Sequence, residues 1–348
     1  MPDRNAAPWT NRRTFSWKSR IPICNPEIQG DCHSCFAISA VQCLSDRYAI
    51  KYGLQKSLDL SPMYALACYE NHKKLDCDSG GYALEVCQVL ESLGTVSRKC
   101  WPDEAIRKLG YCPESKFGSV GAVGCCASGC TVNGKNEYAK YYARKRSTQK
   151  IYATQPGSPT TPDIKQTVEM LCREIWIRGP VVACMRIPRK LATFLTQASS
   201  HTENMFYDPP RRGDTVENGK DASEIVGAHS VCITGWVIDS KQRRYWEIRS
   251  SSKTRCGYYY MLSSEHYGND SDLIGLDVPI QIQVPSRAQS RLRTAPQSNV
   301  LWGGATRIDA GELKSSSRTN AFSTTATLSI ASIFTMAFLT GIRHCFRN

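Results

Sequence analysis

The sequence predicts an α+β protein in which a mainly helical first half is followed by a strand-rich second half. Two observations indicate this fold class. Before residue 95, apolar residues recur at the three- and four-residue spacing of amphipathic helices. After residue 180, short runs of β-branched and aromatic residues are separated by turn-forming residues, as in strands and hairpins. With 348 residues, the chain is long enough for one large or two small domains with a substantial core.

Three helices are expected in the first half. The first covers residues 35–51, where apolar side chains repeat on one helical face. The second covers residues 57–70, with Pro62 at a favoured first helical position. The third is bounded by Gly81 and Gly94, because glycine commonly ends a helix.

The second half begins with a short helix over residues 167–178, which Gly179 and Pro180 close. The expected strands after it are residues 181–185, 230–238, 245–249, 258–261 and 278–284. We therefore expect a helical lobe over residues 21–160 and a strand-rich lobe over residues 161–285, with a cleft between them.

The 17 cysteines suggest a disulfide framework made in an oxidising compartment, and their odd number leaves at least one thiol. Residues 100–134 are rich in glycine and read as a loop region held by disulfides. The cysteines of this loop region are Cys100, Cys112, Cys125, Cys126 and Cys130. Zinc is the competing interpretation, but paired C-x₂-C spacing and histidine are both missing from this stretch, so no metal is expected.

The two ends of the chain have different compositions. Residues 1–20 read as an extended polar lead-in without the apolar core of a signal peptide, so we expect the natural start upstream or near a mature terminus. Residues 286–320 read as a flexible linker rich in Ser, Arg and Thr. Residues 321–342 carry no charge and are long enough to cross a bilayer.

The short basic tail, residues 343–348, follows the expected transmembrane helix and would be cytoplasmic under the positive-inside tendency. The globular part would then be lumenal or extracellular, in a secretory or endolysosomal compartment or at the cell surface. A glycolipid-anchor signal is disfavoured, because its apolar tail would not end in this basic sequence.

The formal net charge is +13, but lysines and arginines are scattered along the chain. The densest cluster surrounds Arg144 and Arg146 in a polar, Tyr-rich segment and is typical of a solvated face. Net charge is the only feature that would support nucleic-acid binding, so we do not expect a nucleic acid as a partner. No phosphate loop or dinucleotide fingerprint is present, and we expect no cofactor.

The chemistry-bearing stretch is residues 29–40. Cys35 falls in the first turn of the expected helix, where backbone N–H groups and the helix dipole favour a thiolate. Gln29, six residues upstream, could supply a side-chain amide as an oxyanion donor. Among six histidines, His229 has the best setting to act as the base, beside small residues at the expected start of a strand. A buried cysteine at a structural helix start and a core histidine are the alternative interpretations.

Residues 32–36, Cys-His-Ser-Cys-Phe, resemble the active-site signature of papain-like cysteine proteases. Further stretches resemble the cathepsin B-like branch of that family, occur in family order and span most of residues 10–285. They are Ser45-Asp46-Arg47, Cys77-Asp78-Ser79-Gly80-Gly81-Tyr82, Gly179-Pro180-Val181, Gly227-Ala228-His229, Tyr245-Trp246-Glu247-Ile248 and residues 265–272. The resemblance implies a papain-like two-lobed fold, with a helical left lobe, a β-barrel-like right lobe and the active site between them.

The resemblance also implies the roles of individual residues. Cys35 corresponds to the nucleophile, His229 to the base and Gln29 to the oxyanion donor. A second group corresponds to the family's substrate-binding positions, namely Gly80, Gly81, Gly227, Ala228 and Asp270, the last as an acid in the second specificity pocket. The family comparison pairs Cys32 with Cys77 in a disulfide. Peptide or protein substrates and a monomeric catalytic part are implied as well.

The sequence departs from the family at three positions. Ser250 stands in place of the Asn that orients the histidine, and Ser252 stands in place of the Trp that shields that hydrogen bond. His33 replaces a glycine beside the nucleophile, where it could narrow the cleft or supply a second imidazole. No histidine lies between residues 73 and 200, so the occluding-loop pair of cathepsin B is missing and endopeptidase action is favoured.

Two functions remain open at this point. The first is a papain-type cysteine endopeptidase that hydrolyses peptide bonds through a thiolate–imidazolium pair of Cys35 and His229, and the presence of Gln29 with these two residues supports it. The second is a membrane-tethered pseudoprotease that binds peptides without turnover, supported by the replacements at Ser250 and Ser252. No inhibitory pro-segment is evident, and Asn269 begins a glycosylation sequon.

Overall fold

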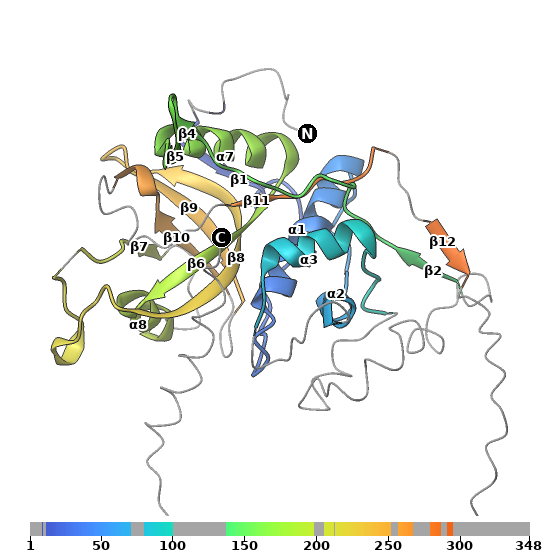
Figure 1. Ribbon diagram of the computed structural model, residues 1–348, viewed down its shortest axis with the longest axis horizontal. Helices are drawn as coiled ribbons and strands as arrows, with labels where there is room; N and C mark the ends of the chain where they lie inside the picture. The colour runs from blue at the N-terminus through green and yellow to red at the C-terminus, as the bar shows by residue number, and fades with distance from the viewer. Residues whose placement is uncertain are drawn as a thin grey trace, which may run out of the picture.

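The computed structural model describes residue 9 and residues 12–70, 80–99, 137–197, 205–211, 213–251, 257–266, 279–286 and 291–294. Figure 1 shows two lobes side by side, one made of helices and one built on a twisted sheet. The α+β prediction is therefore confirmed, and the order of the lobes along the chain is the expected one.

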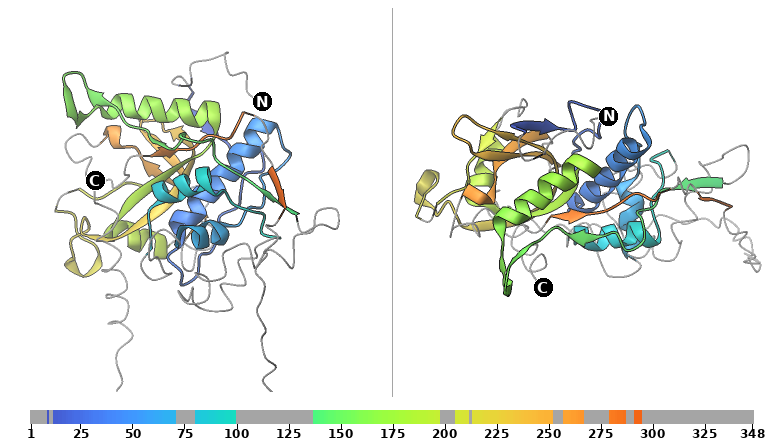
Figure 2. Two further views of the ribbon diagram at one scale, coloured as in Figure 1. Left: turned by 45° about the vertical axis from the view of Figure 1, so that its right-hand side comes forward. Right: turned by 90° about the horizontal axis from the view of Figure 1, so that it is seen from above.

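The helical lobe contains α1 (Cys35–Tyr52), α2 (Pro62–Glu70) and α3 (Ala83–Ser92). Helix α1 is buried along almost its whole length because it lies between the other two helices and the sheet, as both views of Figure 2 show. It ends at Gly53, whose positive φ of 62° is readily adopted by glycine and whose N–H donates to the Ala49 carbonyl. Helices α1 and α3 match the expected ones, whereas α2 begins at Pro62 and not at residue 57.

The sheet lobe is built on eight strands in the order β3-β11-β6-β8-β9-β10-β7, with β1 paired to β8 outside this path. The strands are β1 (Thr14–Ser16), β3 (Gln149–Lys150), β6 (Val181–Pro188), β7 (Phe206–Tyr207), β8 (Ile225–Ile238), β9 (Arg244–Ser250), β10 (Gly257–Leu262) and β11 (Ile280–Gln281). Helices α7 (Ile164–Arg178) and α8 (Arg189–Gln197) cover it. Two separate hairpins pair β4 (Thr154–Gln155) with β5 (Ser158–Pro162) and β12 (Arg291–Thr294) with β2 (Glu137–Lys140).

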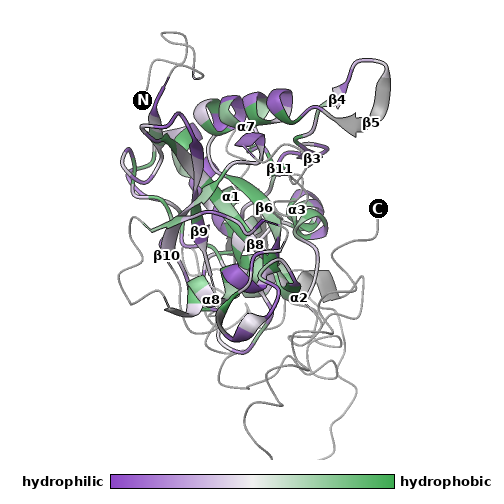
Figure 3. Cartoon of the chain, turned by 90° about the vertical axis from the view of Figure 1, so that its left-hand side faces the viewer, coloured by the Kyte–Doolittle hydropathy of each residue, from purple (hydrophilic) through white to green (hydrophobic). Residues whose placement is uncertain are grey.

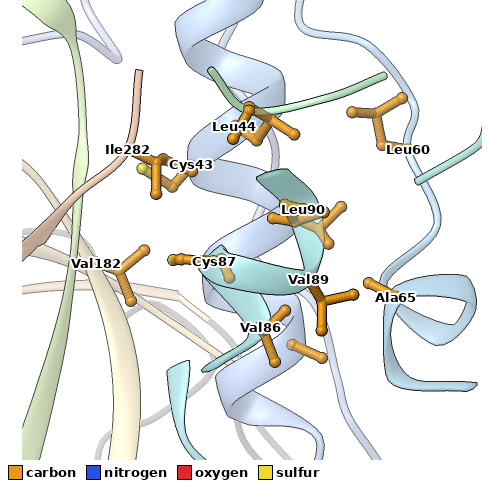
Figure 4. Packing of buried hydrophobic residues seen from close by; sticks show 14 of the residues in the cluster. Cys43, Leu44, Leu60, Ala65, Val86, Cys87, Val89, Leu90, Val182 and Ile282 are labelled. Atoms are coloured by element: carbon orange, nitrogen blue, oxygen red, sulfur yellow. The ribbon is translucent and has the colours of Figure 1, made fainter. Parts of the chain in front are cut away.

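Two hydrophobic cores divide the molecule. The sheet lobe has its own core beneath α7, and Figure 3 shows the central strands β6 and β8 as its hydrophobic centre. The core of the helical lobe continues across to the sheet. Figure 4 shows Cys43 of α1 and Cys87 of α3 directed toward Val182 of β6 and Ile282, all four in one cluster. The two lobes therefore share buried surface where α1 and α3 face β6.

Two buried ion pairs connect α1 to the sheet lobe. Asp46 lies 2.7 Å from Arg249 of β9, and both side chains are at most 1% exposed. The next residue, Arg47, lies 2.8 Å from Glu174 of α7 and also donates to the Pro180 carbonyl. A buried charge that loses its partner is costly, so these pairs fix the position of α1.

Several elements differ from the expectation. Residues 14–16 form β1 and the Phe15 ring is buried in the core, so the polar lead-in expected over residues 1–20 does not extend past residue 13. Helix α7 begins three residues early, because the Asp163 carboxylate caps it by accepting from the Gln166 N–H. The linker expected over residues 286–320 includes β12, whose partner strand is far away in sequence.

One further helix was not expected, and one expected strand is shorter than predicted. Helix α8 follows β6 and was not expected, although Leu191, Phe194 and Leu195 have the spacing of one helical face. The strand expected over residues 278–284 shortens to β11, since only Ile280 and Gln281 pair with neighbouring strands.

Cysteine chemistry also differs from the expectation. Seven of the described cysteines are thiols: Cys24, Cys35, Cys43, Cys87, Cys172, Cys184 and Cys232. Most of them are buried and serve as small core residues, so cysteine count overstated the disulfide content of this part of the chain. Cys32 is disulfide-bonded, while its expected partner Cys77 lies outside the described residues.

The expected transmembrane helix over residues 321–342 lies outside the described residues, as do the tail over residues 343–348 and Asn269. Among the residues that the structure describes, no helix combines the length and apolarity needed to cross a membrane.

We predict that the Arg249→Met variant lowers the free energy of unfolding by about 3–5 kcal/mol, because it leaves the Asp46 carboxylate buried without its cation. The double variant Asp46→Asn/Arg249→Met should recover a large part of this loss, since Asn keeps an acceptor for the Cys24 N–H. Urea denaturation measures both. The control is Arg189→Ala, which breaks a surface pair with Glu224 and should cost under about 1 kcal/mol. A double variant no more stable than Arg249→Met would contradict this account.

Candidate active site

The first turn of α1 surrounds the Cys35 sulfur with backbone donors. The N–H groups of Cys35, Phe36 and Ser230 form hydrogen bonds with it, each of which favours the thiolate. Ser230 directly follows His229 on β8, so the sulfur lies beside the histidine-bearing stretch of the sheet. Cys35 itself is partly exposed.

His229 lies inside β8, not at its start as the sequence suggested, and its side chain is 8% exposed. It pairs in register with Met185 of β6, and the next pair along the ladder is Ser230 with Cys184. The strand begins earlier than expected because residues 225–228 pair with β6 despite their small side chains. The backbone of His229 is therefore held in the sheet by its pairing with β6.

The protonation of His229 can be read from its partners. Its Nε2 lies 3.1 Å from the Ser250 hydroxyl, and the Ser250 hydroxyl in turn donates to the Ser251 carbonyl at 3.3 Å. The Ser251 carbonyl also accepts a hydrogen bond from the imidazole, which raises the pKa of His229. The Ser250 hydroxyl uses its own proton toward Ser251, so it accepts from Nε2, and Nε2 therefore carries a proton. In the neutral imidazole, Nδ1 then carries the lone pair and can accept a proton.

Gln29 lies on the loop before α1. Its side-chain Nε2 donates to the Cys32 carbonyl at 3.1 Å, and its Oε1 accepts from the Ser251 hydroxyl at 3.3 Å. A primary amide has two N–H donors, so one remains for a ligand. The Gln29 amide therefore has a defined orientation beside the loop that leads into α1.

Burial opposes ionisation of both central groups. Desolvation raises the pKa of the Cys35 thiol to about 11, although the backbone donors and the helix start act in the opposite direction. Desolvation also lowers the pKa of His229 to about 4. Burial therefore acts against the thiolate that the helix position favours. A neutral thiol beside a neutral imidazole is the form that burial favours.

The remaining predicted positions fall into three groups. A Cβ added to Gly81 would lie 2.6 Å from the Phe36 ring, so only glycine fits there, and Gly80 has a positive φ of 68° next to His33. Gly227 and Ala228 lie in β8 just before His229. Asp270 lies outside the described residues.

Among the described residues, the candidate site coincides neither with the cavity near α8 nor with a group of possible metal ligands. A cavity of about 710 Å³ lies in the sheet lobe beside α8 and β7, lined by Phe194, Phe206 and Tyr245 among others, and contains none of the predicted site residues. Within the described ranges, no group of three His, Cys, Asp or Glu side chains could hold a metal ion.

Ser251 is the site residue that the sequence did not reveal. Its carbonyl faces His229 and its hydroxyl faces Gln29, yet it reads in the sequence as one of three consecutive serines. Only its position next to Ser250 could have drawn attention to it.

The structure thus brings together a cysteine at a helix start, a histidine on the facing sheet and a glutamine amide on the loop before that helix. The chain belongs to the papain family: its residues 12–273 match the family described as papain family cysteine protease. The papain-like prediction is thus confirmed, and so is the resemblance to the cathepsin B-like branch.

Relatives and solved structures agree with this assignment. The chain is 31% identical over 240 residues to cathepsin B-like CP3 of Giardia intestinalis, covering 68% of this chain and 64% of that protein. It is 25% identical over 254 residues to cathepsin B-like cysteine proteinase 3 of Caenorhabditis elegans, covering 70% and 59%. The match thus spans less than two thirds of either relative. The fold resembles procathepsin B S9 from Trypanosoma congolense, with a TM-score of 0.52 at 18% identity, covering 82% of this chain and 81% of that one.

We predict that His229 makes stability depend on pH between about 6.5 and 4. Its pKa is lowered from 6.5 to about 4 by folding, so below pH 6.5 the unfolded chain binds a proton that the folded chain does not. The free energy of unfolding should therefore fall by up to roughly 3 kcal/mol as the pH drops through this window. Urea denaturation from pH 7 to 4 should show a shallower fall in His229→Gln, and parallel curves would contradict the lowered pKa.

Proposed function

We propose that this protein is a cysteine endopeptidase that hydrolyses peptide bonds with Cys35 as nucleophile, His229 as base and Gln29 as oxyanion donor. One observation supports these roles above the others. The Ser250 hydroxyl donates to the Ser251 carbonyl and so accepts the proton on Nε2 of His229, which leaves Nδ1 as the proton acceptor for a thiol.

The reaction follows from this protonation state. Nδ1 takes the Cys35 proton as the sulfur bonds to the peptide carbonyl carbon, and the carbonyl oxygen becomes negative. The second amide N–H of Gln29 and the Cys35 backbone N–H stabilise that oxygen. The imidazolium then gives its proton to the leaving amine. Water, deprotonated by Nδ1, releases the acid product and restores the thiol.

Ser250 takes the place of the family's Asn in this scheme. Its hydroxyl accepts from Nε2 and remains neutral, so it sets the tautomer and stabilises the imidazolium. With the Trp position replaced by Ser252, we propose lower activity than in relatives that keep both residues. We propose peptide or protein substrates bound along Gly80, Gly81, Gly227 and Ala228, with Asp270 in the second specificity pocket. A secretory or endolysosomal location, membrane attachment through residues 321–342 and a monomeric catalytic part stay predictions.

A peptide-binding pseudoprotease is the second candidate function. The burial that raises the pKa of Cys35 and lowers that of His229 favours it, because both effects raise the cost of transferring a proton between them. In that case the groove would bind peptides and Cys35 would not react.

We expect the full chain to hydrolyse fluorogenic peptide substrates, and Cys35→Ala to abolish this hydrolysis because the nucleophile is removed. The measurement is initial rate against substrate concentration for both proteins. The matched control is Cys172→Ala, which changes a buried thiol of α7 away from the site. Hydrolysis retained in Cys35→Ala, or missing from folded wild-type protein that still binds peptide, would contradict the peptidase.

Ser250→Ala should lower kcat by about ten- to a hundredfold with little change in KM, since the imidazole loses an acceptor for its Nε2 proton. Ser263→Ala removes another fully buried serine hydroxyl, one without a hydrogen-bond partner among the described residues, and should leave kcat unchanged. Equal kcat values for Ser250→Ala and the wild type would show that Ser250 does not orient His229.

A further inference from the structure

A second thiol lies next to the proposed nucleophile. Cys35 and Cys184 both carry thiols, and both residues are partly exposed. They come from different lobes, because Cys35 begins α1 whereas Cys184 lies in the middle of β6. Three other thiols of the same interior are buried, namely Cys43, Cys87 and Cys232. A partly exposed thiol beside the site is therefore in a different position from the thiols that only fill the core.

Ser230 lies between the two thiols. Its backbone N–H donates to the Cys35 sulfur, and its hydroxyl oxygen lies 3.5 Å from the Cys184 sulfur. Cys184 and Ser230 are also direct partners in the ladder between β6 and β8, so their side chains lie side by side on one face of the sheet. Both sulfurs thus contact one residue that is 3% exposed and fixed in the sheet.

The two sulfurs also interact electrostatically. Desolvation is the largest cause of the raised pKa of Cys35, and Cys184 is the next group that raises it. Such an effect weakens with distance, so the two thiols are neighbours. By contrast, Cys43 lies eight residues further along α1, roughly 12 Å along the helix axis, and Cys232 donates to the carbonyl of Ser39, one turn beyond Cys35. Among these thiols, Cys184 has the best placement to react with Cys35.

The chemistry of such a pair follows from the oxidation of thiols by a hydroperoxide. When His229 takes the Cys35 proton, the sulfur can bond to one peroxide oxygen, the O–O bond breaks, and the other oxygen leaves as water with that proton. The product is a sulfenic acid, which condenses with a neighbouring thiol. The Cys184 sulfur then bonds to the Cys35 sulfur, and the hydroxyl group leaves as water with the Cys184 proton. The two thiols together lose the two electrons that the peroxide gains.

We propose that Cys184 is a resolving thiol, which forms a reversible disulfide with Cys35 when a hydroperoxide oxidises the nucleophile. The disulfide blocks peptide hydrolysis, and it also protects Cys35 from the sulfinic and sulfonic acids that thiol reductants do not reverse. This inference rests on the proposed reactivity of Cys35 with His229. Its product is a covalent bond, which can be measured without any peptide turnover.

The test treats the full chain with hydrogen peroxide and maps its cysteines by mass spectrometry after alkylation without reduction. The wild type should give a peptide pair linked through Cys35 and Cys184. Cys184→Ser should give no such pair, and its Cys35 should proceed to the sulfinic acid. The matched control is Cys172→Ala, which removes a buried thiol of α7 and should behave as the wild type does.

Peptide hydrolysis, with each protein compared with its own untreated rate, measures reversibility. After peroxide and then dithiothreitol, the wild type and Cys172→Ala should recover at least about four-fifths of their rates. Cys184→Ser should recover less than about one fifth, because a thiol reductant does not reduce a sulfinic acid.

The outcomes separate the two proposals. If peroxide converts wild-type Cys35 to the sulfinic acid, or links it to a cysteine other than Cys184, the role of Cys184 is overturned while the peptidase stands. A linked pair in a chain that hydrolyses no peptide would support the role of Cys184 and overturn the peptidase. A Cys35 that stays an unmodified thiol in peroxide would overturn the inference as well. The mapping of the wild type decides these outcomes even where a variant does not fold.

Discussion

The adjacent charges Asp46 and Arg47 fix the position of α1, and the candidate site depends on that position. One pairs with Arg249 of β9 and the other with Glu174 of α7, all within a dry interior. Arg249 directly precedes Ser250, so the ion pair that holds the helix also holds the strand that orients His229. Breaking such a pair costs far more than a surface pair because the remaining charge stays buried. The two ion pairs thereby fix the position of α1 relative to the sheet of the other lobe.

The burial that fixes this geometry also acts against the chemistry. A thiol at a helix start, surrounded by backbone donors, would be acidic if water reached it. Here desolvation outweighs those donors and raises the pKa of Cys35 to about 11, while it lowers that of His229 to about 4. In the proposed reaction, a proton therefore moves within a neutral pair at the moment of attack. The orientation of Nδ1 then matters more than a resting charge, and the contact between Nε2 and the Ser250 hydroxyl sets that orientation.

Local patterns in the sequence predicted much of the fold. Helical spacing located α1 and α3, and alternation located β8, β9 and β10, because these elements bury one face or lie in the centre of the sheet. The pairing of β1 with β8 and of β12 with β2 depends on contacts distant in sequence, which no local pattern encodes. The family motifs identified Cys35, His229 and Gln29 as the candidate catalytic residues. Ser251 was missed because a serine reveals its role only through partners 22 and 222 residues away, or through its own carbonyl.

The most direct test of the account is the rate of Cys35 alkylation by iodoacetamide at pH 6, with the modified cysteine mapped by mass spectrometry, in the wild type and in His229→Ala. Near that pH a thiol with a raised pKa hardly reacts unless a base takes its proton. If Nδ1 of His229 is that base, the wild type should react at least about a hundredfold faster than the variant, and at Cys35. Equal, slow rates in two folded proteins would contradict proton transfer between the two residues and favour a site that binds peptides without cleaving them.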